Sequence, residues 1–282
     1  MPVLFPDTTP DAERILITLL RQASPRRKIQ MLGQMNQTAR GLALAGLKQR
    51  HPGADPEELH RRLAELLFGP ETAVHIHSPV KTSAEEPMLS EQIQATLPVV
   101  KTLENLEVPY LIGGSFAGAV HGVVRTTLDT DIIAELRAEH IHPLVTSLQP
   151  AYYIDENAVR EAVRRRSSFN LIHQETMFKV DIFVSPGRPF DKAQFLRRVA
   201  ITPAPDQEET IYAASPEDTI LSKLEWYRQG GEVSERQWRD VLGILAVQAD
   251  RLDFAYLRKW AANLGVADLL EKAIDQVNPN DD

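Results

Sequence analysis

Cysteine is absent from this sequence of 282 residues. Disulfides, thiolate metal sites and a cysteine nucleophile are therefore excluded, as suits a reducing compartment. No apolar run approaches the roughly 18 residues that a membrane-spanning helix needs. The first 14 residues also lack the basic and apolar regions of a signal peptide. We therefore expect a cytoplasmic protein with no membrane partner.

Basic residues are outnumbered by acidic ones, since the sequence has 31 Lys and Arg and 39 Asp and Glu, which gives a net charge of −8. Proteins that coat nucleic acid non-specifically neutralise many phosphates with Lys and Arg, so the balance argues against that class. The composition does not exclude a local basic patch on the surface. With 43% hydrophobic and 25% charged residues, the chain has the composition of a globular protein of one large or two ordinary domains.

Residues 1–70 carry apolar residues at helical spacing. Ser24 before Pro25 and Asp55 before Pro56 are typical of a helix cap followed by a first-turn proline. We predict a separate N-terminal unit of three helices here. Residues 71–87 lose the periodicity and gather Pro, Ser, Thr and Glu, which indicates a linker. Its alternate histidines receive no role.

Residues 88–205 mix helical and extended patterns, and residues 206–282 return to helices. In the first stretch we expect a helix broken or restarted at Pro98, and strands near 108–112, 128–136, 167–174 and 177–184. The last two of these strands could pair as a hairpin. The predicted fold class is α+β: a small mixed β-sheet domain with flanking helices, a C-terminal helical bundle and the N-terminal helical unit.

Two acids interrupt an apolar predicted strand, Asp129 and Asp131 in LDTDIIAEL. Residues two apart in a strand point to the same face, so these carboxylates lie close and repel each other. A divalent cation would remove the repulsion, and Mg²⁺ in phosphate chemistry is held by a few carboxylates and substrate oxygens. Asp181 is a third acid in a predicted strand.

Gly113, Gly114 and Ser115 stand at a predicted strand-to-helix turn. Glycines there let a phosphate approach the backbone, and the helix N-terminus favours its negative charge. The Ser115 hydroxyl would add a donor. Three strand carboxylates and one phosphate-binding turn predict a site for nucleotide chemistry.

The arrangement GGS, then 13 residues, then DTDI with a later strand aspartate resembles the nucleotidyltransferase superfamily of DNA polymerase β. The subtype is most similar to AbiEii-type toxin nucleotidyltransferases, in which an arginine and a threonine precede the paired acids, as Arg125 and Thr126 do here. That family also carries a helical lysine and an Arg-Asp pair on the next helix, matched by Lys223, Arg239 and Asp240. The resemblance covers about residues 95–275.

The resemblance implies two-metal nucleotidyl transfer with Mg²⁺ or Mn²⁺. Asp129 and Asp131 would bind the ions that hold the triphosphate, and Asp181 would complete the second ion site and help activate the acceptor hydroxyl. Gly113, Gly114 and Ser115 would surround the phosphates.

Further side chains receive roles by the same resemblance. Lys223 would contact the triphosphate as a point charge, and Asp240 would orient Lys223 or the nucleotide. Arg125 would brace the acid strand or meet a phosphate.

Each of these interpretations has a structural alternative. Asp129 and Asp131 could be a solvent-facing pair on an edge strand, and Asp181 could simply pair with Lys179 on the same face. Lys223, Arg239 and Asp240 could form an ion network on the helix surface. The basic run 164–166 is either a solvated face or a contact for RNA.

The resulting hypothesis is an enzyme that moves a nucleoside monophosphate from a nucleoside triphosphate to an RNA end or a protein hydroxyl, in a toxin-like role. The alternative is an inactive transferase fold that binds a partner protein in an antitoxin-like manner. In both cases the N-terminal helices would form the contact with a partner protein.

Overall fold

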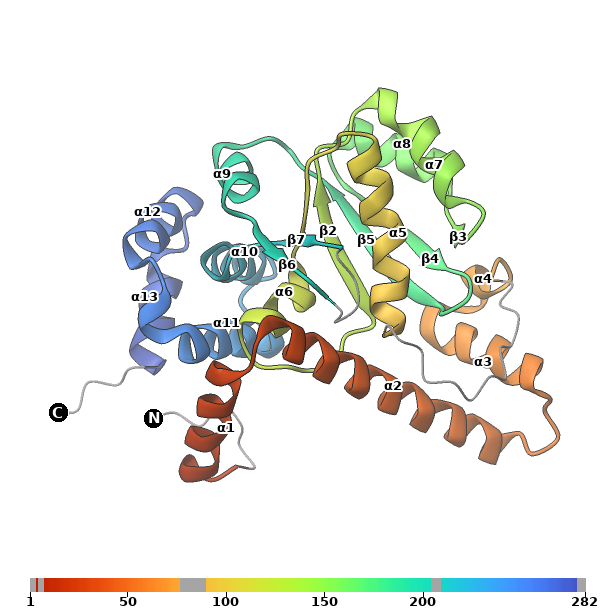
Figure 1. Ribbon diagram of the computed structural model, residues 1–282, viewed down its shortest axis with the longest axis horizontal. Coiled ribbons are helices and arrows are strands. Elements are labelled where there is room, and N and C mark those ends of the chain that lie inside the picture. Colours follow the sequence, from red (N-terminus) through yellow and green to blue (C-terminus); the bar gives the residue numbers. More distant parts are fainter. Residues whose placement is uncertain (1–3, 5–7, 77–89, 204–208, 278–282) are drawn as a thin grey trace. The chain divides into compact units, whose positions relative to one another are not determined.

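The protein is described here by a computed structural model that covers residue 4 and residues 8–76, 90–203 and 209–277. Its helices are α1 (Pro10–Gln22), α2 (Pro25–Arg50), α3 (Pro56–Phe68), α4 (Pro70–Ala73), α5 (Glu91–Asn105), α6 (Gly114–His121), α7 (Ile141–Leu148), α8 (Glu156–Arg165), α9 (Pro189–Arg197), α10 (Pro216–Gln229), α11 (Glu235–Gln248), α12 (Phe254–Leu264) and α13 (Ala267–Val277) (Figure 1). Its strands are β1 (Tyr110–Ile112), β2 (Asp129–Ala134), β3 (Tyr152–Tyr153), β4 (Ser168–His173), β5 (Phe178–Val184), β6 (Val199–Ile201) and β7 (Ile211–Ala213). Short 3-10 helices η1 (Ala138–His140) and η2 (Ala249–Arg251) complete the set.

The chain divides into two compact units, each built from separate stretches of sequence. The first comprises Met1–Ile29, Ile112–Arg125 and Arg188–Asp282, and the second comprises Gln30–Leu111 and Thr126–Gly187. The α+β class with parallel and antiparallel strands and a helical C-terminal part is confirmed. The sequential domains ending at residues 70, 87 and 205 stay a prediction, because compactness does not test independent folding. Most of the predicted linker, residues 77–87, lies outside the described residues.

The second unit contains strands in the order β3-β4-β5-β2-β1. β4 and β5 pair antiparallel, so the predicted hairpin is confirmed, whereas β2 and β5 pair parallel. Helix α5 packs against β2 and β5, and it also contacts α7 (Figure 1). Helix α8 contacts β4 and β5.

Burial alternates along β2 and fixes which side chains face helix α5. Thr130 is fully buried, and its hydroxyl accepts hydrogen bonds from Gln92 Nε2 at 3.1 Å and from Thr96 Oγ1 at 3.2 Å, both on α5. Because successive strand residues point to opposite faces, Asp129 and Asp131 lie on the face away from α5. Thr130 therefore points away from the acids.

Helix α5 continues through Pro98, so the break expected there is wrong. An interior proline removes one helical hydrogen bond and costs about 3 kcal/mol. The apolar side chains around it, Leu97, Val99 and Val100, are buried. Packing of these residues offsets the local cost, which a sequence pattern alone does not reveal.

The N-terminal helices share a small core with the sheet of the second unit. Leu47, Leu63 and Ala73 from α2, α3 and α4 cluster with Met177, which stands between β4 and β5. Buried Asn36 on α2 accepts a hydrogen bond from the Thr127 backbone N–H at 3.0 Å. These helices therefore pack on the acid-bearing part of the second unit as well as on one another.

Replacing Asn36 with Ala should lower the free energy of unfolding by about 1 to 3 kcal/mol, because the buried Thr127 N–H then lacks its acceptor. Chemical denaturation measures the change. Gln37→Ala, an exposed position on the same helix, is the matched control and should stay within about 0.5 kcal/mol of the wild type. Equal losses in both variants would contradict the role of Asn36.

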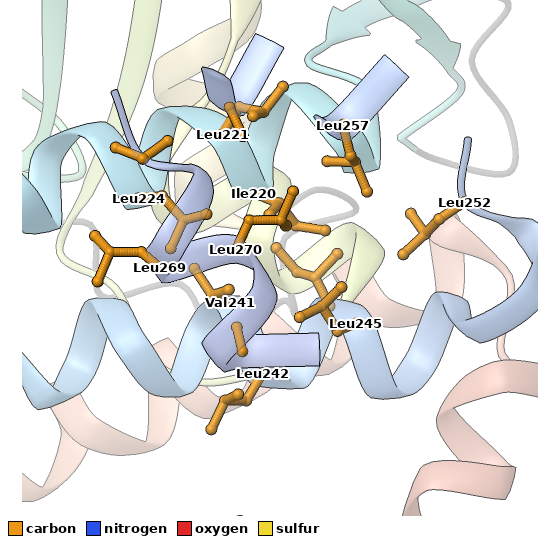
Figure 2. Packing of buried hydrophobic residues seen from close by; sticks show 14 of the residues in the cluster. Ile220, Leu221, Leu224, Val241, Leu242, Leu245, Leu252, Leu257, Leu269 and Leu270 are labelled. Carbon is orange, nitrogen blue, oxygen red and sulfur yellow. The ribbon is translucent and has the colours of Figure 1, made fainter. Parts of the chain in front are cut away.

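The first unit has its main core among the C-terminal helices. Figure 2 shows side chains of α10, α11, α12 and α13 converging, including Ile220, Leu221, Val241, Leu257 and Leu270. Helices α10 and α11 each begin with a capping serine, since Ser215 Oγ accepts from the Asp218 N–H and Ser234 Oγ from the Gln237 N–H.

The first unit also holds a small group of strands. Ile112, the last residue of β1, pairs in parallel with Ala213 of β7, and β7 pairs antiparallel with β6. Helix α6 contacts α10 and α11. Within the described ranges, no helix combines the length and the apolar character required to cross a bilayer.

Candidate functional site

One face of β2, β4 and β5 in the second unit carries the predicted acids. Asp131 on β2 is the register partner of Asp181 on β5, and Asp129 is opposite Lys179. Asn170 on β4 is opposite Asp181. Side chains at register positions on one face are direct neighbours. The strands therefore bring Asp129, Asp131 and Asp181 to one face of the sheet, as the sequence predicted. This face is called the acid face.

Lys179 lies among these acids. Its Nζ is 2.7 Å from Asp181 Oδ2 and 3.8 Å from Asp129 Oδ2. Burial lowers the pKa of Lys179, but the hydrogen bond and charge of Asp181, together with the charges of Asp129 and Asp131, outweigh burial, so the pKa is raised overall. Burial raises the pKa of Asp181, and the Lys179 ammonium only partly opposes this. The Lys179–Asp181 pair that the sequence offered as an alternative is present.

The three aspartates carry the carboxylate oxygens that Mg²⁺ prefers as ligands, and they lie on one face of the strands. As arranged in the described part of the chain, however, no three His, Cys, Asp or Glu side chains are grouped to hold a metal ion. The Lys179 ammonium holds an oxygen of Asp181 that such an ion would use. Cation binding at this face therefore requires Lys179 to move away from Asp181.

Replacing Lys179 with Met should increase the affinity for Mn²⁺ by about tenfold, because a charged hydrogen bond that competes with the ion is removed. Calorimetric titration with manganese chloride measures the affinity. Lys192→Met, which removes a lysine outside this face, is the control and should bind as the wild type does. Unchanged affinity in Lys179→Met would contradict the competition.

The glycine turn belongs to the first unit and begins α6. Gly114 has φ of +53°, in the left-handed region where a side chain is unfavourable. Gly113 is the residue that caps the helix. Ser115 Oγ accepts a hydrogen bond from Arg125 Nη2 at 2.9 Å. The turn therefore uses Gly114 for its backbone shape and ties Ser115 to a cation.

Arg125, Lys223 and Asp240 form a compact charged cluster with Ser115 in the first unit. Arg125 donates to both Asp240 carboxylate oxygens, at 2.8 and 2.7 Å. Lys223 Nζ donates to Asp240 Oδ2 at 2.7 Å. The Lys223 and Asp240 side chains are only 7% and 10% exposed. Arg125 from the loop after α6 and Lys223 from α10, both chosen by resemblance, thus converge on the Asp240 carboxylate of α11.

The electrostatics of this cluster keep Asp240 ionised. Burial alone would raise its pKa, but hydrogen bonds and charge from Arg125 and Lys223 lower it overall. Gly118 on α6 permits the approach of Lys223, since a Cβ there would stand 3.2 Å from Lys223 Cε. Two cations share one carboxylate, so the cluster carries net positive charge beside Ser115.

Two arginines on α11 are placed differently from what the resemblance implies. Arg239 is exposed and pairs with Glu235 on its own helix, so the contact to Lys223 comes from Asp240 alone. Arg236 was not singled out by the sequence, yet its Nη2 is 3.4 Å from Ser115 Oγ. Its position one helical turn before Asp240 is the signal that could have identified it.

The three arginines of the basic run 164–166 make contacts within the protein. Arg164 and Arg165 are exposed and both pair with Glu161 on α8. Arg166 ends that helix and donates to the Leu136 and Ser185 carbonyls. A contact of this basic run with RNA stays a prediction.

The family model of Rv0078B-related antitoxin matches residues 21–95, which is less than half of the chain. No curated protein matches.

Solved structures similar in fold include an antigenic nucleotidyltransferase-like protein from Paracoccidioides brasiliensis, at 18% identity and a TM-score of 0.40, covering 64% of this chain and 94% of that one. A solution structure of the antibiotic-resistance factor ANT(2'')-Ia matches at 10% identity and a TM-score of 0.39, over 64% of this chain and 97% of that one. ANT(2'')-Ia in complex with adenylyl-2''-tobramycin matches at 10% identity and a TM-score of 0.41, over 62% and 97%.

Proposed function

We propose that this protein is a metal-dependent nucleotidyltransferase that moves a nucleoside monophosphate from a nucleoside triphosphate to a hydroxyl acceptor. The observation that carries the proposal is the placement of Asp129, Asp131 and Asp181 on one face of two parallel strands. An aspartate array of this kind on a sheet face is costly unless it serves a cation. The AbiEii-type assignment rests on the same residues and on Arg125, Lys223 and Asp240.

The reaction forms one P–O bond and breaks another. The acceptor oxygen attacks the α-phosphorus, the bond from that phosphorus to the bridging oxygen of pyrophosphate breaks, and pyrophosphate leaves with the bonding electron pair. The acceptor proton passes to a carboxylate and then to solvent. Asp181 suits this acceptance because its pKa is raised by burial. Bound Mg²⁺ or Mn²⁺ would supply charge stabilisation of the phosphate oxygens.

The charged cluster around Asp240 would bind the phosphate oxygens. Lys223 and Arg125 carry the positive charge, and Ser115 presents a hydroxyl at the start of α6. Asp240 orients both cations, since it accepts hydrogen bonds from each of them. Gly113 and Gly114 leave the backbone open to a phosphate.

The acceptor in this proposal is an RNA end or a protein hydroxyl, and the setting is a cytoplasmic toxin-antitoxin system. The match of residues 21–95 to an antitoxin-related family model supports a partner protein that binds the N-terminal helices. The net charge of −8 disfavours a long duplex as acceptor.

A second function is favoured by one specific observation, the ion pair of Lys179 with Asp181. If that ammonium permanently replaces a metal ion, the fold is inactive and serves as an antitoxin-like binding module. The same antitoxin-related match supports this alternative. The two functions differ in whether nucleotide is ever transferred.

The test is incubation with each α-labelled nucleoside triphosphate, Mg²⁺ or Mn²⁺ and a cell lysate, followed by separation of RNA and protein. The proposal expects label in one acceptor class with the wild type and none with Asp129→Ala combined with Asp131→Ala. Label that persists in the double variant, or no label from any nucleotide, would reject the enzyme in favour of the binding module.

A further inference from the structure

Asp129 lies at the end of its strand, unlike the other two aspartates of the acid face. It is the first residue of β2, and residues 122–128 before it form no helix or strand. Asp131, by contrast, lies inside β2 as the register partner of Asp181. The ends of elements fray more readily than their interiors, so contacts outside the sheet are needed to fix Asp129.

Two amide side chains anchor the chain on either side of Asp129. Asn36 Oδ1 on α2 accepts a hydrogen bond from the Thr127 N–H at 3.0 Å. Gln92 Nε2 on α5 donates to Thr130 Oγ1 at 3.1 Å, and Asn36 Nδ2 donates to Gln92 Oε1 at 3.5 Å. All four of these residues are buried. A buried polar network whose members are paired makes one arrangement rigid, so α2 and α5 together fix the backbone around Asp129.

The Asp129 carboxylate itself is oriented by Thr127. The Thr127 hydroxyl donates to Asp129 Oδ1 at 2.8 Å, and hydrogen bonds to an ionised acceptor are among the stronger ones. The other oxygen, Oδ2, is 3.8 Å from Lys179 Nζ on the acid face. One carboxylate oxygen is therefore held by the neighbouring threonine, and the other faces the side chains of the acid face.

A cavity of about 520 Å³ borders this hydrogen bond. Asn36, Arg40 and Thr72 from the N-terminal helices line it together with Thr127 and Asp129. The Asp129 side chain is 31% exposed, and exposed side chains change rotamer within nanoseconds where no contact holds them. The Thr127 hydroxyl supplies that contact, so it limits Asp129 to one orientation beside the cavity.

We propose that Asn36 and Thr127 are positioning residues for Asp129, through which helix α2 prepares the acid face to bind a cation. Thr127 holds Oδ1 so that Oδ2 stays available on the acid face, and Asn36 holds Thr127 in place. The use of Oδ2 by a cation rests on the proposed function. The N-terminal helices, which lie outside the resemblance to nucleotidyltransferases, thereby become part of the candidate site.

The test is titration of the full chain with Mn²⁺, without nucleotide, followed by electron paramagnetic resonance. Thr127→Val keeps the shape of the side chain but removes the donor. The affinity for Mn²⁺ should fall about 10- to 100-fold, as it does when a group that supports a metal ligand is lost. Thr127→Ser keeps the donor and should bind as the wild type does. Thr38→Val makes the same change at an exposed threonine on α2, and this matched control should leave the affinity unchanged.

Asn36→Ala should also weaken Mn²⁺ binding, because Thr127 then loses its anchor, whereas Gln37→Ala should not. Loss of folded protein would lower the number of sites per chain, whereas loss of positioning lowers the affinity of each site, and the titration gives both quantities. Wild-type affinity in Thr127→Val would overturn the inference, and so would an equal loss in Thr127→Ser. Wild-type affinity in Asn36→Ala would exclude α2 from the positioning.

These outcomes are separate from those of nucleotide transfer. Weaker Mn²⁺ binding in Thr127→Val, with no transfer from any nucleotide by the wild type, would reject the enzyme and retain the positioning of Asp129. Transfer by the wild type, with unchanged Mn²⁺ affinity in Thr127→Val, would retain the enzyme and reject the positioning. A wild type that binds no Mn²⁺ would reject both.

Discussion

Replacing Asp240 with Asn should lower the free energy of unfolding by about 3 to 5 kcal/mol, the usual cost of removing one partner from a buried ion pair. Asp240 accepts hydrogen bonds from Arg125 and Lys223. Without its charge, the 7% exposed Lys223 side chain is left beside Arg125 with no buried counter-charge from this position. Chemical denaturation followed by circular dichroism measures the change.

Glu235→Gln provides the control on the same helix. Glu235 pairs with Arg239 at 3.3 Å, and both side chains are largely exposed. Exposed pairs contribute about 0 to 1 kcal/mol, so this variant should unfold almost as the wild type does. Similar denaturation midpoints for Asp240→Asn and Glu235→Gln would show that the cluster is not an important source of stability.

Replacing Asp131 with Asn should reduce the initial rate of nucleotidyl transfer at least about a hundredfold. Changes in groups that merely support metal ligands already cost about 10- to 100-fold, and Asp131 faces Asp181 directly across β2 and β5. The amide keeps the shape of the side chain but removes its charge. Rates are measured with the nucleotide and acceptor identified by labelling.

Folding should survive this change, because removal of one carboxylate relieves repulsion on the acid face. Glu139→Gln, an exposed acid on η1, is the control and should transfer at the wild-type rate. A rate for Asp131→Asn within twofold of the wild type would exclude Asp131 from the reaction.

The acid face could be predicted because strand periodicity is strict. Strand residues two positions apart point to the same face. The apolar neighbours of Asp129, Asp131 and Asp181 indicated that these acids lie in strands. The β4–β5 hairpin followed from two adjacent extended patterns, and its register places Asn170 opposite Asp181. The same hairpin could therefore have identified Asn170 from the sequence.

Other features depend on contacts that no local pattern encodes. The uninterrupted course of α5 through Pro98 depends on tertiary packing. Three-residue strands such as β6 and β7 are too short for a periodic signal. Helix α8 was missed for another reason, since its local signals, the cap Asp155 and basic residues in the last turn, are present in the sequence. The stability of such elements comes from the residues that pack on them.

The charged cluster illustrates the same limit for the site. Resemblance selected Lys223 and Asp240, and the structure brings them to 2.7 Å. Sequence alone could not decide whether Lys179 pairs with Asp181, because both sit on one face in any register. It also could not place Arg40 or Thr72 beside Asp129, since that proximity arises only when the N-terminal helices pack on the sheet.

The proposed reaction depends on a divalent cation bound at the acid face. Electron paramagnetic resonance of Mn²⁺, titrated with a nucleoside triphosphate into the wild type and into Asp129→Asn combined with Asp131→Asn, tests it directly. We predict that the wild type depletes the signal of free Mn²⁺ and that the double variant leaves it near the level of nucleotide alone. Equal depletion by both proteins would contradict the claim.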